Sequence, residues 1–158
     1  MRKVNYIKGD ATFPQAEGVK IIAHICNDVG AWGKGFVLAI SKRWKEPEAA
    51  YRLWYRNRIK NDFQLGNIAI VQVEEYVYVA NMIGQKGIKI RSRSIPVRYD
   101  AVQECLKKLS IQAKKLEASV HMPRIGCGLA GGRWDEVEPL INATLMANNI
   151  ETFVYDFK

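Results

Sequence analysis

Apolar residues along the chain recur with the two-residue period of strands in some segments and the three-to-four-residue period of helices in others. Strand-like patterns cover residues 3–8, 19–26, 67–73, 76–82, 119–122 and 152–157, and helical patterns cover residues 36–44, 47–54 and 97–117. The run at residues 19–26 is apolar almost throughout, which is typical of a strand covered on both faces. Glu74 and Glu75 separate two strands, and this spacing predicts a hairpin.

The start of the last helix is predicted from its polar residues. Asp135 followed by Glu138 has the form of a capping box, so we expect Asp135 to cap the helix. Pro139 then falls near the first turn, where proline does little harm. Strands that alternate with helices, plus one hairpin, predict a three-layer α/β/α sandwich with a mixed, largely parallel central sheet. A length of 158 residues predicts one domain.

Composition narrows the class of protein. Hydrophobic residues make up 48% and charged residues 25% of the chain, and no apolar run reaches the roughly twenty residues that a membrane span needs. We therefore expect a soluble protein with no membrane partner. Cys26, Cys105 and Cys127 lack metal-ligand spacing, which predicts reduced thiols in a cytoplasm, with no metal and no cofactor. A net charge of +8 favours an anionic partner without choosing among nucleic acid, nucleotide and phosphate.

Glycines concentrate in two loops, each lying between an apolar strand and a helix. The first loop contains Gly30, Gly33 and Gly35, and the second contains Gly126, Gly128, Gly131 and Gly132. Glycine permits positive φ angles, and the backbone amides and helix N-termini that follow such loops bind anions. Because ligands of such sheets bind at the carboxyl ends of the strands, we expect both loops to converge on one phosphate-sized hollow. A purely conformational role for the glycines is the alternative.

Four segments of the chain resemble the macrodomain family. They are Gly9-Asp10 after the first strand, His24-Ile25-Cys26-Asn27 running into Gly30-Ala31-Trp32-Gly33-Lys34-Gly35, then Met122-Pro123-Arg124-Ile125-Gly126-Cys127-Gly128-Leu129, and the final strand with Tyr155. The resemblance spans nearly the whole chain in order. It is greatest to the branch that holds the ADP-ribose 1''-phosphatases and the terminal ADP-ribose protein glycohydrolases. It implies a single macrodomain over residues 1–158 whose partner is ADP-ribose or an ADP-ribosylated substrate.

The resemblance assigns ligand-binding roles by position. Asp10 would accept a hydrogen bond from the adenine amino group, Tyr155 or Phe157 would stack on adenine, and Asn27 would bind the terminal ribose hydroxyls. A turn role for Asp10 and a core role for Tyr155 are the alternatives. The expected ligand-binding set is Asp10, Ala11, Asn27, Gly33, Lys34, Gly35, Phe36, Gly126, Cys127, Gly128, Leu129, Ala130, Gly131 and Tyr155.

His24 and Asn27 are the candidate catalytic residues. His24 interrupts an apolar strand just before the first glycine loop, and its position matches a histidine proposed as functional in the phosphatase members. We expect metal-independent hydrolysis of ADP-ribose 1''-phosphate or of ADP-ribosylated protein or nucleic acid, with His24 or Asn27 helping to polarise a water. A buried histidine bonded to the backbone is the alternative. Cys127 is expected to be a small apolar lining residue rather than a nucleophile.

At two positions the chain differs from the glycohydrolase members of the family, and these differences favour another function for the site. Glycohydrolase members carry an acid after the Gly-Cys-Gly-Leu segment and a lysine after the hairpin, whereas this chain has Ala130 and Ile83-Gly84-Gln85 there. Lys86, Asp28 and Asp135 are the nearest replacements, but surface charge or helix capping explains each of them. The second hypothesis is therefore a non-catalytic module that binds ADP-ribose.

A third hypothesis is a protein that binds the phosphate backbone of nucleic acid. Its cations would be Lys86, Lys89, Arg91, Arg93 and Arg98, in an exposed basic loop over residues 84–95 and just beyond it. The loop has no interleaved aromatic residues on which bases could stack. Nucleic acid is therefore expected only as a carrier of ADP-ribose.

Overall fold

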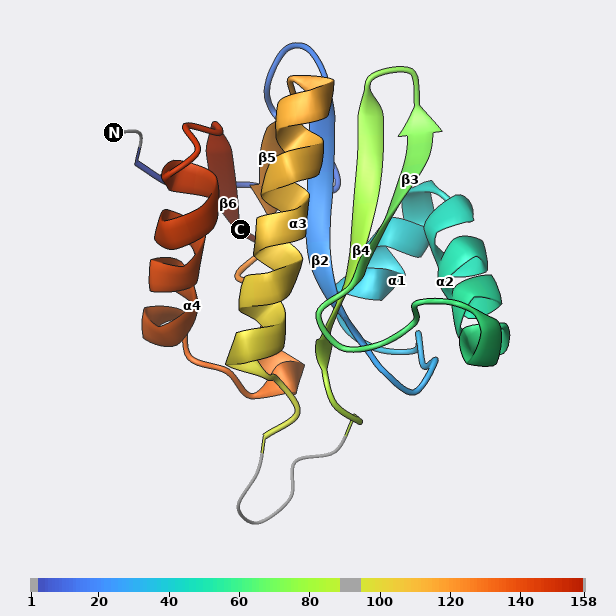
Figure 1. Ribbon diagram of the computed structural model, residues 1–158. Coiled ribbons are helices and arrows are strands. Elements are labelled where there is room, and N and C mark those ends of the chain that lie inside the picture. The colour runs from blue at the N-terminus through green and yellow to red at the C-terminus, as the bar shows by residue number, and fades with distance from the viewer. Residues whose placement is uncertain (1–2, 89–94, 158) are drawn as a thin grey trace.

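The computed structural model describes residues 3–88 and 95–157, which form a six-stranded sheet between two layers of helices (Figure 1). The strands lie in the order β1-β6-β5-β2-β4-β3. All neighbouring strands are parallel except β3 and β4, which form the predicted hairpin. The strands are β1 (Asn5–Lys8), β2 (Lys20–Asn27), β3 (Ile68–Glu74), β4 (Val77–Gln85), β5 (Ser119–Met122) and β6 (Thr152–Asp156).

Helices cover both faces of the sheet, which confirms the predicted α/β/α sandwich. The helices α1 (Phe36–Arg43) and α2 (Glu46–Arg56) lie on one face, and α3 (Tyr99–Leu116) and α4 (Trp134–Ile141) lie on the other (Figure 1). The short helical turns are η1 (Arg58–Lys60), η2 (Gly128–Ala130) and η3 (Asn142–Met146). Among the described residues, no helix is long and apolar enough to cross a membrane.

The strand β2 lies at the centre of the sheet and is covered on both faces, as its apolar run predicts. Ile21 and Ala23 belong to the core cluster that includes residues of α3 and α4. Ile22 and Cys26 belong to the cluster that includes residues of α1 and α2. Burial of each large aliphatic side chain stabilises the fold by about 1.5–3 kcal/mol. The position of β2 is therefore fixed from both sides, and so is the point where the first glycine loop begins.

The strand β4 is longer than its apolar pattern predicts. It runs to Gln85, and its last residues still pair with β2. Gly84 permits this close packing, because a Cβ atom there would lie 2.9 Å from the side chain of Val102 on α3. The expected basic loop over residues 84–95 therefore begins later, and part of it lies outside the described residues, namely Lys89, Arg91 and Arg93.

The capping box predicted for α4 is wrong. The helix begins at Trp134 with Arg133 at its N-cap, and no side chain caps it. The Tyr99 hydroxyl at the start of α3 accepts a 3.1 Å hydrogen bond from the Arg133 amide, which ties the N-cap of α4 to α3. Asp135 lies within the first turn, with its carboxylate 2.7 Å from the Arg133 guanidinium. Pro139 consequently lies inside the helix, beyond the first turn.

A buried polar network joins β5 and β6 beneath the loop that follows β1. His121 Nδ1 lies 2.7 Å from the Tyr155 hydroxyl, and His121 Nε2 lies 2.8 Å from Ser119 Oγ. The Gln15 amide donates a 2.8 Å hydrogen bond to the same Tyr155 hydroxyl. Burial, together with the positive charge of Lys20, lowers the pKa of His121 to about 3. The imidazole is therefore neutral in the folded protein at neutral pH.

Acid should destabilise the fold through His121. Its folded pKa of about 3 lies below the unfolded value of about 6.5, so the unfolded chain binds the proton first and the free energy of unfolding falls as the pH drops below about 6.5. The slope from one such group is at most about 1.4 kcal/mol per pH unit. Chemical denaturation of the wild type and of His121→Gln at pH 7 and pH 5 measures the effect. An equal pH dependence in both proteins would contradict this account.

Candidate functional site

Both glycine loops border one cavity of about 440 Å³ at the carboxyl edge of the parallel strands. The first loop and the start of α1 contribute Lys34, Gly35 and Phe36 to its lining. The second loop contributes Gly126, Cys127, Gly128, Leu129 and Ala130, and the strands contribute His24, Ile25 and Gln85. In Figure 1 both loops lie at the lower edge of the sheet. The predicted convergence of the two loops on one hollow is confirmed.

The second loop is curled into a closed backbone ring. Gly126, Gly128 and Gly131 have φ angles of 77°, 68° and 79°, which side chains rarely permit. The Gly132 amide donates a 2.8 Å hydrogen bond to the Gly126 carbonyl and closes the ring. A Cβ atom on Gly132 would lie 2.3 Å from that carbonyl oxygen. Glycine at these four positions is therefore what allows the backbone ring to form.

Several backbone amides of the cavity lining have no protein acceptor among the described residues. Those of Gly35 and Phe36 at the N-terminus of α1, and those of Gly128 and Leu129 in the second loop, donate to no acceptor in the described parts of the chain. The N-terminus of a helix carries a partial positive charge. The Lys34 side chain lines the same cavity and adds a full one. This combination of N–H donors and positive potential suits phosphate groups.

Asn27 shapes the first loop from within. Its Oδ1 accepts hydrogen bonds from the amides of Val29 and Ala31, at 3.0 and 3.1 Å, and from the Tyr51 hydroxyl at 2.8 Å. Its Nδ2 donates to the Ala31 carbonyl at 2.8 Å. The side chain is buried and does not line this cavity. Its direct contact with a ribose stays a prediction, whereas its role in folding the loop follows from these bonds.

A second cavity of about 540 Å³ adjoins the first and shares Phe36 and Pro123 with it. It extends past α1 to the end of β1 and the end of β6. Its other lining residues are Gly9, Asp10, Ala11, Thr12, Phe13, Ala39, Lys42, Arg43, Tyr155 and Phe157. The two cavities together make an elongated cleft, with the predicted adenine residues at one end and the glycine loops at the other.

The predicted adenine residues differ in how freely they can meet a ligand. Asp10 Oδ1 accepts hydrogen bonds from the amide and hydroxyl of Thr12, at 2.9 and 2.7 Å, whereas Oδ2 accepts none from the described residues. Tyr155 is buried with its hydroxyl engaged, and its ring forms part of the cavity wall. Phe157 is 79% exposed at the same cavity. Of the two aromatic residues, Phe157 offers the open ring face.

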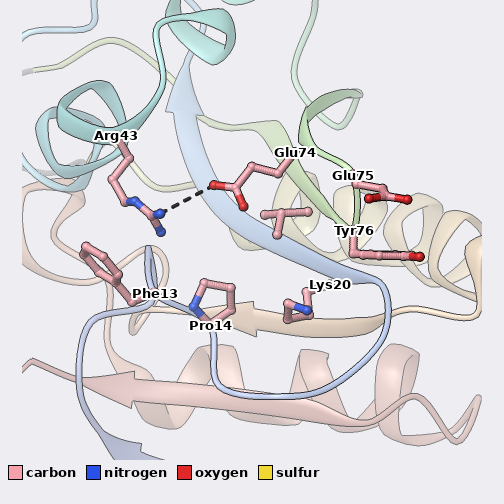
Figure 2. A pocket seen from close by; sticks show the side chains of 8 residues that line it. Phe13, Pro14, Lys20, Arg43, Glu74, Glu75 and Tyr76 are labelled. Atoms are coloured by element: carbon pink, nitrogen blue, oxygen red, sulfur yellow. Dashed lines mark hydrogen bonds and ion pairs between the residues drawn. The ribbon is translucent and has the colours of Figure 1, made fainter.

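Arg43 holds the loop after β1 against the rest of the site (Figure 2). Its guanidinium donates to the Thr12 carbonyl, lies 3.4 Å from the Glu74 carboxylate and stacks 4.1 Å from the Phe13 ring centre. Arg43 also lines a separate hollow of about 360 Å³ near Lys20, at the start of β2. Figure 2 shows the side chains that line this hollow. Sequence reasoning missed Arg43, because an arginine in the last turn of a helix is usually solvated.

His24 belongs to the central strand β2 and lines the first cavity. It is 1% exposed, its Nε2 lies 2.6 Å from Asn81 Oδ1, and its ring meets the Trp32 ring edge to face at 5.4 Å. Burial lowers the pKa of His24 to about 4, although the hydrogen bond with Asn81 partly opposes this shift. Its Nδ1 is buried and has no hydrogen-bond partner in the described parts of the chain. The side chain is therefore neutral at neutral pH, and one polar atom is unsatisfied.

Lys86, Asp28 and Asp135, the nearest replacements for the family's lysine and acid, line neither of the two cavities. Ala130 is buried, and Gln85 lines the first cavity while its amide donates to the Gly87 carbonyl at 2.9 Å. The Asp28 carboxylate accepts a 2.8 Å hydrogen bond from the Gly87 amide, and Asp135 pairs with an arginine. Neither aspartate lines either cavity. Both carboxylates are thus explained by local structure.

Cys127 lines the first cavity without the features of an activated thiol. Burial raises its pKa, and the nearby positive charge of Arg124 only partly opposes this. A nucleophilic thiol requires the opposite shift. In addition, the described residues contain no group of three or more His, Cys, Asp and Glu side chains that could hold a metal ion.

Solved structures with the same fold include close relatives in sequence. A macrodomain protein from Streptomyces coelicolor is 56% identical, with a TM-score of 0.89 over 99% of this chain and 100% of that one. A Bacteroides thetaiotaomicron protein of unknown function is 55% identical, with a TM-score of 0.95 over 98% of both chains. The macrodomain of Thermus aquaticus DarG is 26% identical, with a TM-score of 0.76 over 98% of both chains.

More distant sequence relatives include named proteins. The mouse chromodomain-helicase-DNA-binding protein 1-like is 33% identical over 98% of this chain but only 18% of its own length, so the chain spans less than a fifth of that relative. An ADP-ribose 1''-phosphate phosphatase from Meyerozyma guilliermondii is 27% identical over 95% of this chain and 98% of its own length. A DNA ADP-ribosyl glycohydrolase from Thermus aquaticus is 26% identical over 87% of this chain and 38% of its own length.

No family model matches the chain. The 56% identity to a macrodomain protein extends over both whole chains, and the fold and both glycine loops agree with the resemblance found in the sequence. The chain belongs to the macrodomain family.

Proposed function

We propose that this protein binds ADP-ribose in the elongated cleft and hydrolyses the bond between its terminal ribose and an attached group. The observation that carries the proposal is the meeting of the two glycine loops, which line the same cavity as Lys34 and include amides that have no acceptor among the described residues. Such an arrangement is complementary to a diphosphate. The names of the phosphatase and glycohydrolase relatives support the same class of ligand and reaction.

In this proposal the two cavities divide the ligand between them. The diphosphate lies at the glycine loops, and adenine lies in the adjoining cavity with its amino group at Asp10 Oδ2. Phe157 covers the open face of the adenine ring, and aromatic stacking stabilises it. Tyr155 and Ala11 supply the cavity wall beneath it. The terminal ribose then falls at the far end of the first cavity, near His24.

The proposed reaction needs a water molecule oriented at the terminal ribose. The lone pair of neutral His24 Nδ1 accepts a hydrogen bond from that water, whose oxygen attacks the anomeric carbon while the bond from that carbon to the leaving group breaks. One proton of the water ends on the leaving group. Asn27 contributes by holding the loop that positions the ribose. Binding geometry supplies most of the rate acceleration.

Three substrates share this chemistry: ADP-ribose 1''-phosphate, ADP-ribosylated protein and ADP-ribosylated nucleic acid. A non-catalytic ADP-ribose-binding module is the second candidate function, and the observation that favours it is the pair Ala130 and Gln85 where the glycohydrolase branch has an acid and a lysine. A cytoplasmic location stays a prediction.

Replacing Asp10 should weaken ADP-ribose binding. Loss of a hydrogen bond to a charged group costs about 1.5–3 kcal/mol, which corresponds to an affinity loss of about tenfold or more. Asp10→Asn keeps an acceptor for the Thr12 turn but presents an amide donor to the adenine amino group, so it isolates the ligand contact. Calorimetric titration with ADP-ribose measures both Asp10→Asn and the matched exposed variant Asp135→Asn, which should bind like the wild type. Unchanged affinity of Asp10→Asn would remove the adenine assignment.

His24→Ala should abolish most of the turnover while retaining ADP-ribose binding. Loss of a group that orients or deprotonates the attacking water typically costs about 100-fold or more in rate. Release of phosphate from ADP-ribose 1''-phosphate, and of ADP-ribose from modified peptide and oligonucleotide, gives the rates. If the wild type turns over none of these substrates but binds ADP-ribose, the non-catalytic module replaces the enzyme.

A further inference from the structure

Asn81 is a fully buried polar residue that none of the roles above uses. It lies on β4 directly beside His24, which is its register partner on β2, so both side chains point to the same face of the sheet. Its amide spans the space between His24 and the start of α2. Buried amides of this kind are found where every hydrogen bond is specified.

The orientation of the Asn81 amide is fixed by α2. Nδ2 donates a 3.1 Å hydrogen bond to the carbonyl of Pro47, a group that can only accept. The opposite orientation would set two oxygen acceptors against each other in a buried site. Oδ1 is therefore the atom that faces His24, at 2.6 Å from Nε2.

An amide oxygen facing Nε2 determines the tautomer of His24. A neutral imidazole has one N–H donor and one bare acceptor. Because Asn81 Oδ1 only accepts, the proton must reside on Nε2, and Nδ1 keeps its lone pair. Cys26 Sγ lies 3.8 Å from the same nitrogen. The imidazole is thus held in a single state by a chain of two hydrogen bonds from Pro47 through Asn81.

With the proton on Nε2, the other ring nitrogen of His24, Nδ1, is a hydrogen-bond acceptor. A buried acceptor without a partner is destabilising, and His24 Nδ1, which has no hydrogen-bond partner among the described residues, belongs to a residue that lines the cavity between the two glycine loops. We propose that Asn81 is a positioning residue for the reaction, which acts through His24 by holding it as the Nε2–H tautomer with Nδ1 ready to accept a hydrogen bond. The inference rests on the proposed function for its effect on turnover, but the tautomer itself can be measured without a substrate.

The first test is the imidazole tautomer of the free wild-type protein. Long-range proton–nitrogen correlation spectra of the histidine-labelled protein at pH 7 distinguish a protonated from an unprotonated ring nitrogen. We expect His24 to have an unprotonated Nδ1. A protonated Nδ1 in the wild type would overturn the inference at once, whatever the enzyme assays give.

Asn81→Leu removes the acceptor at similar volume. His24 should then populate both tautomers, and turnover should fall about tenfold or more while the affinity for ADP-ribose changes less than threefold. Cys26→Ala is the matched control, because it perturbs the same buried cluster without removing the acceptor. It should keep the single tautomer and turnover within about threefold of the wild type. Wild-type turnover and tautomer in Asn81→Leu would refute the positioning role and leave the proposed hydrolysis intact.

Asn81→Asp gives a readout that a merely structural role would not change, and it serves if the leucine variant does not fold. A carboxylate beside Nε2 raises the pKa of His24, and below that pKa Nδ1 is protonated and cannot accept a hydrogen bond. Turnover of Asn81→Asp should therefore fall as the pH drops from 8 to 5, by at least tenfold more than turnover of the wild type. Parallel pH profiles in the two proteins would refute the inference.

The other groups around His24 do not supply this pH dependence. Burial raises the pKa of Cys26 on β2 and of Tyr51 on α2, so both stay neutral between pH 5 and pH 8. Burial also raises the pKa of the Cys127 thiol in the second loop. The charged side chains that line the same cavity are those of Lys34 and Arg124, and they are the same in both proteins. If the wild type has no turnover, the proposed hydrolysis fails, while the spectra still decide the tautomer.

Discussion

The parallel pairing of β2 with both β4 and β5 is the constraint on which the site depends. Parallel neighbours bring their carboxyl ends to the same edge of a sheet, so the loop after β2 and the loop after β5 must emerge side by side. Burial of β2 on both faces then leaves it no freedom to slide. The cavity between the loops is thus a product of strand order, and the glycines only give its walls their shape.

Much of this arrangement could be predicted from the sequence, because it rests on periodicity. The apolar run of β2, the long amphipathic α3 and the hairpin all follow from local patterns, and the two glycine loops follow from position relative to the strands. The parts that could not be predicted depend on contacts from distant segments. The N-cap of α4 is Arg133, whose amide donates to the Tyr99 hydroxyl, rather than Asp135. The side-chain amide of Asn27 is occupied by its own loop and by Tyr51.

The site combines positively charged side chains with a neutral histidine, His24, which is the candidate catalytic residue. Lys34, Arg124 and residues of both glycine loops line the first cavity, whereas His24, which lines the same cavity, is kept neutral by burial. A protonated imidazole there would add attraction for an anion, but it would lose the lone pair at Nδ1. The sequence alone indicated a histidine in an apolar strand. Its neutral charge follows from burial, and the tautomer that we propose for it depends on Asn81 and Pro47, which lie on other elements and carry no pattern that marks them.

The hydrogen bond between Gly132 and Gly126 has a consequence for the energetics of recognition. A glycine-rich segment that became ordered only around its ligand would lose much backbone freedom at that moment, about 1–2 kcal/mol for each residue fixed. Here the ring closes on itself within the protein, so that entropy is lost during folding. Association with an anion then requires little rearrangement of this segment, and more of the contact energy appears as affinity.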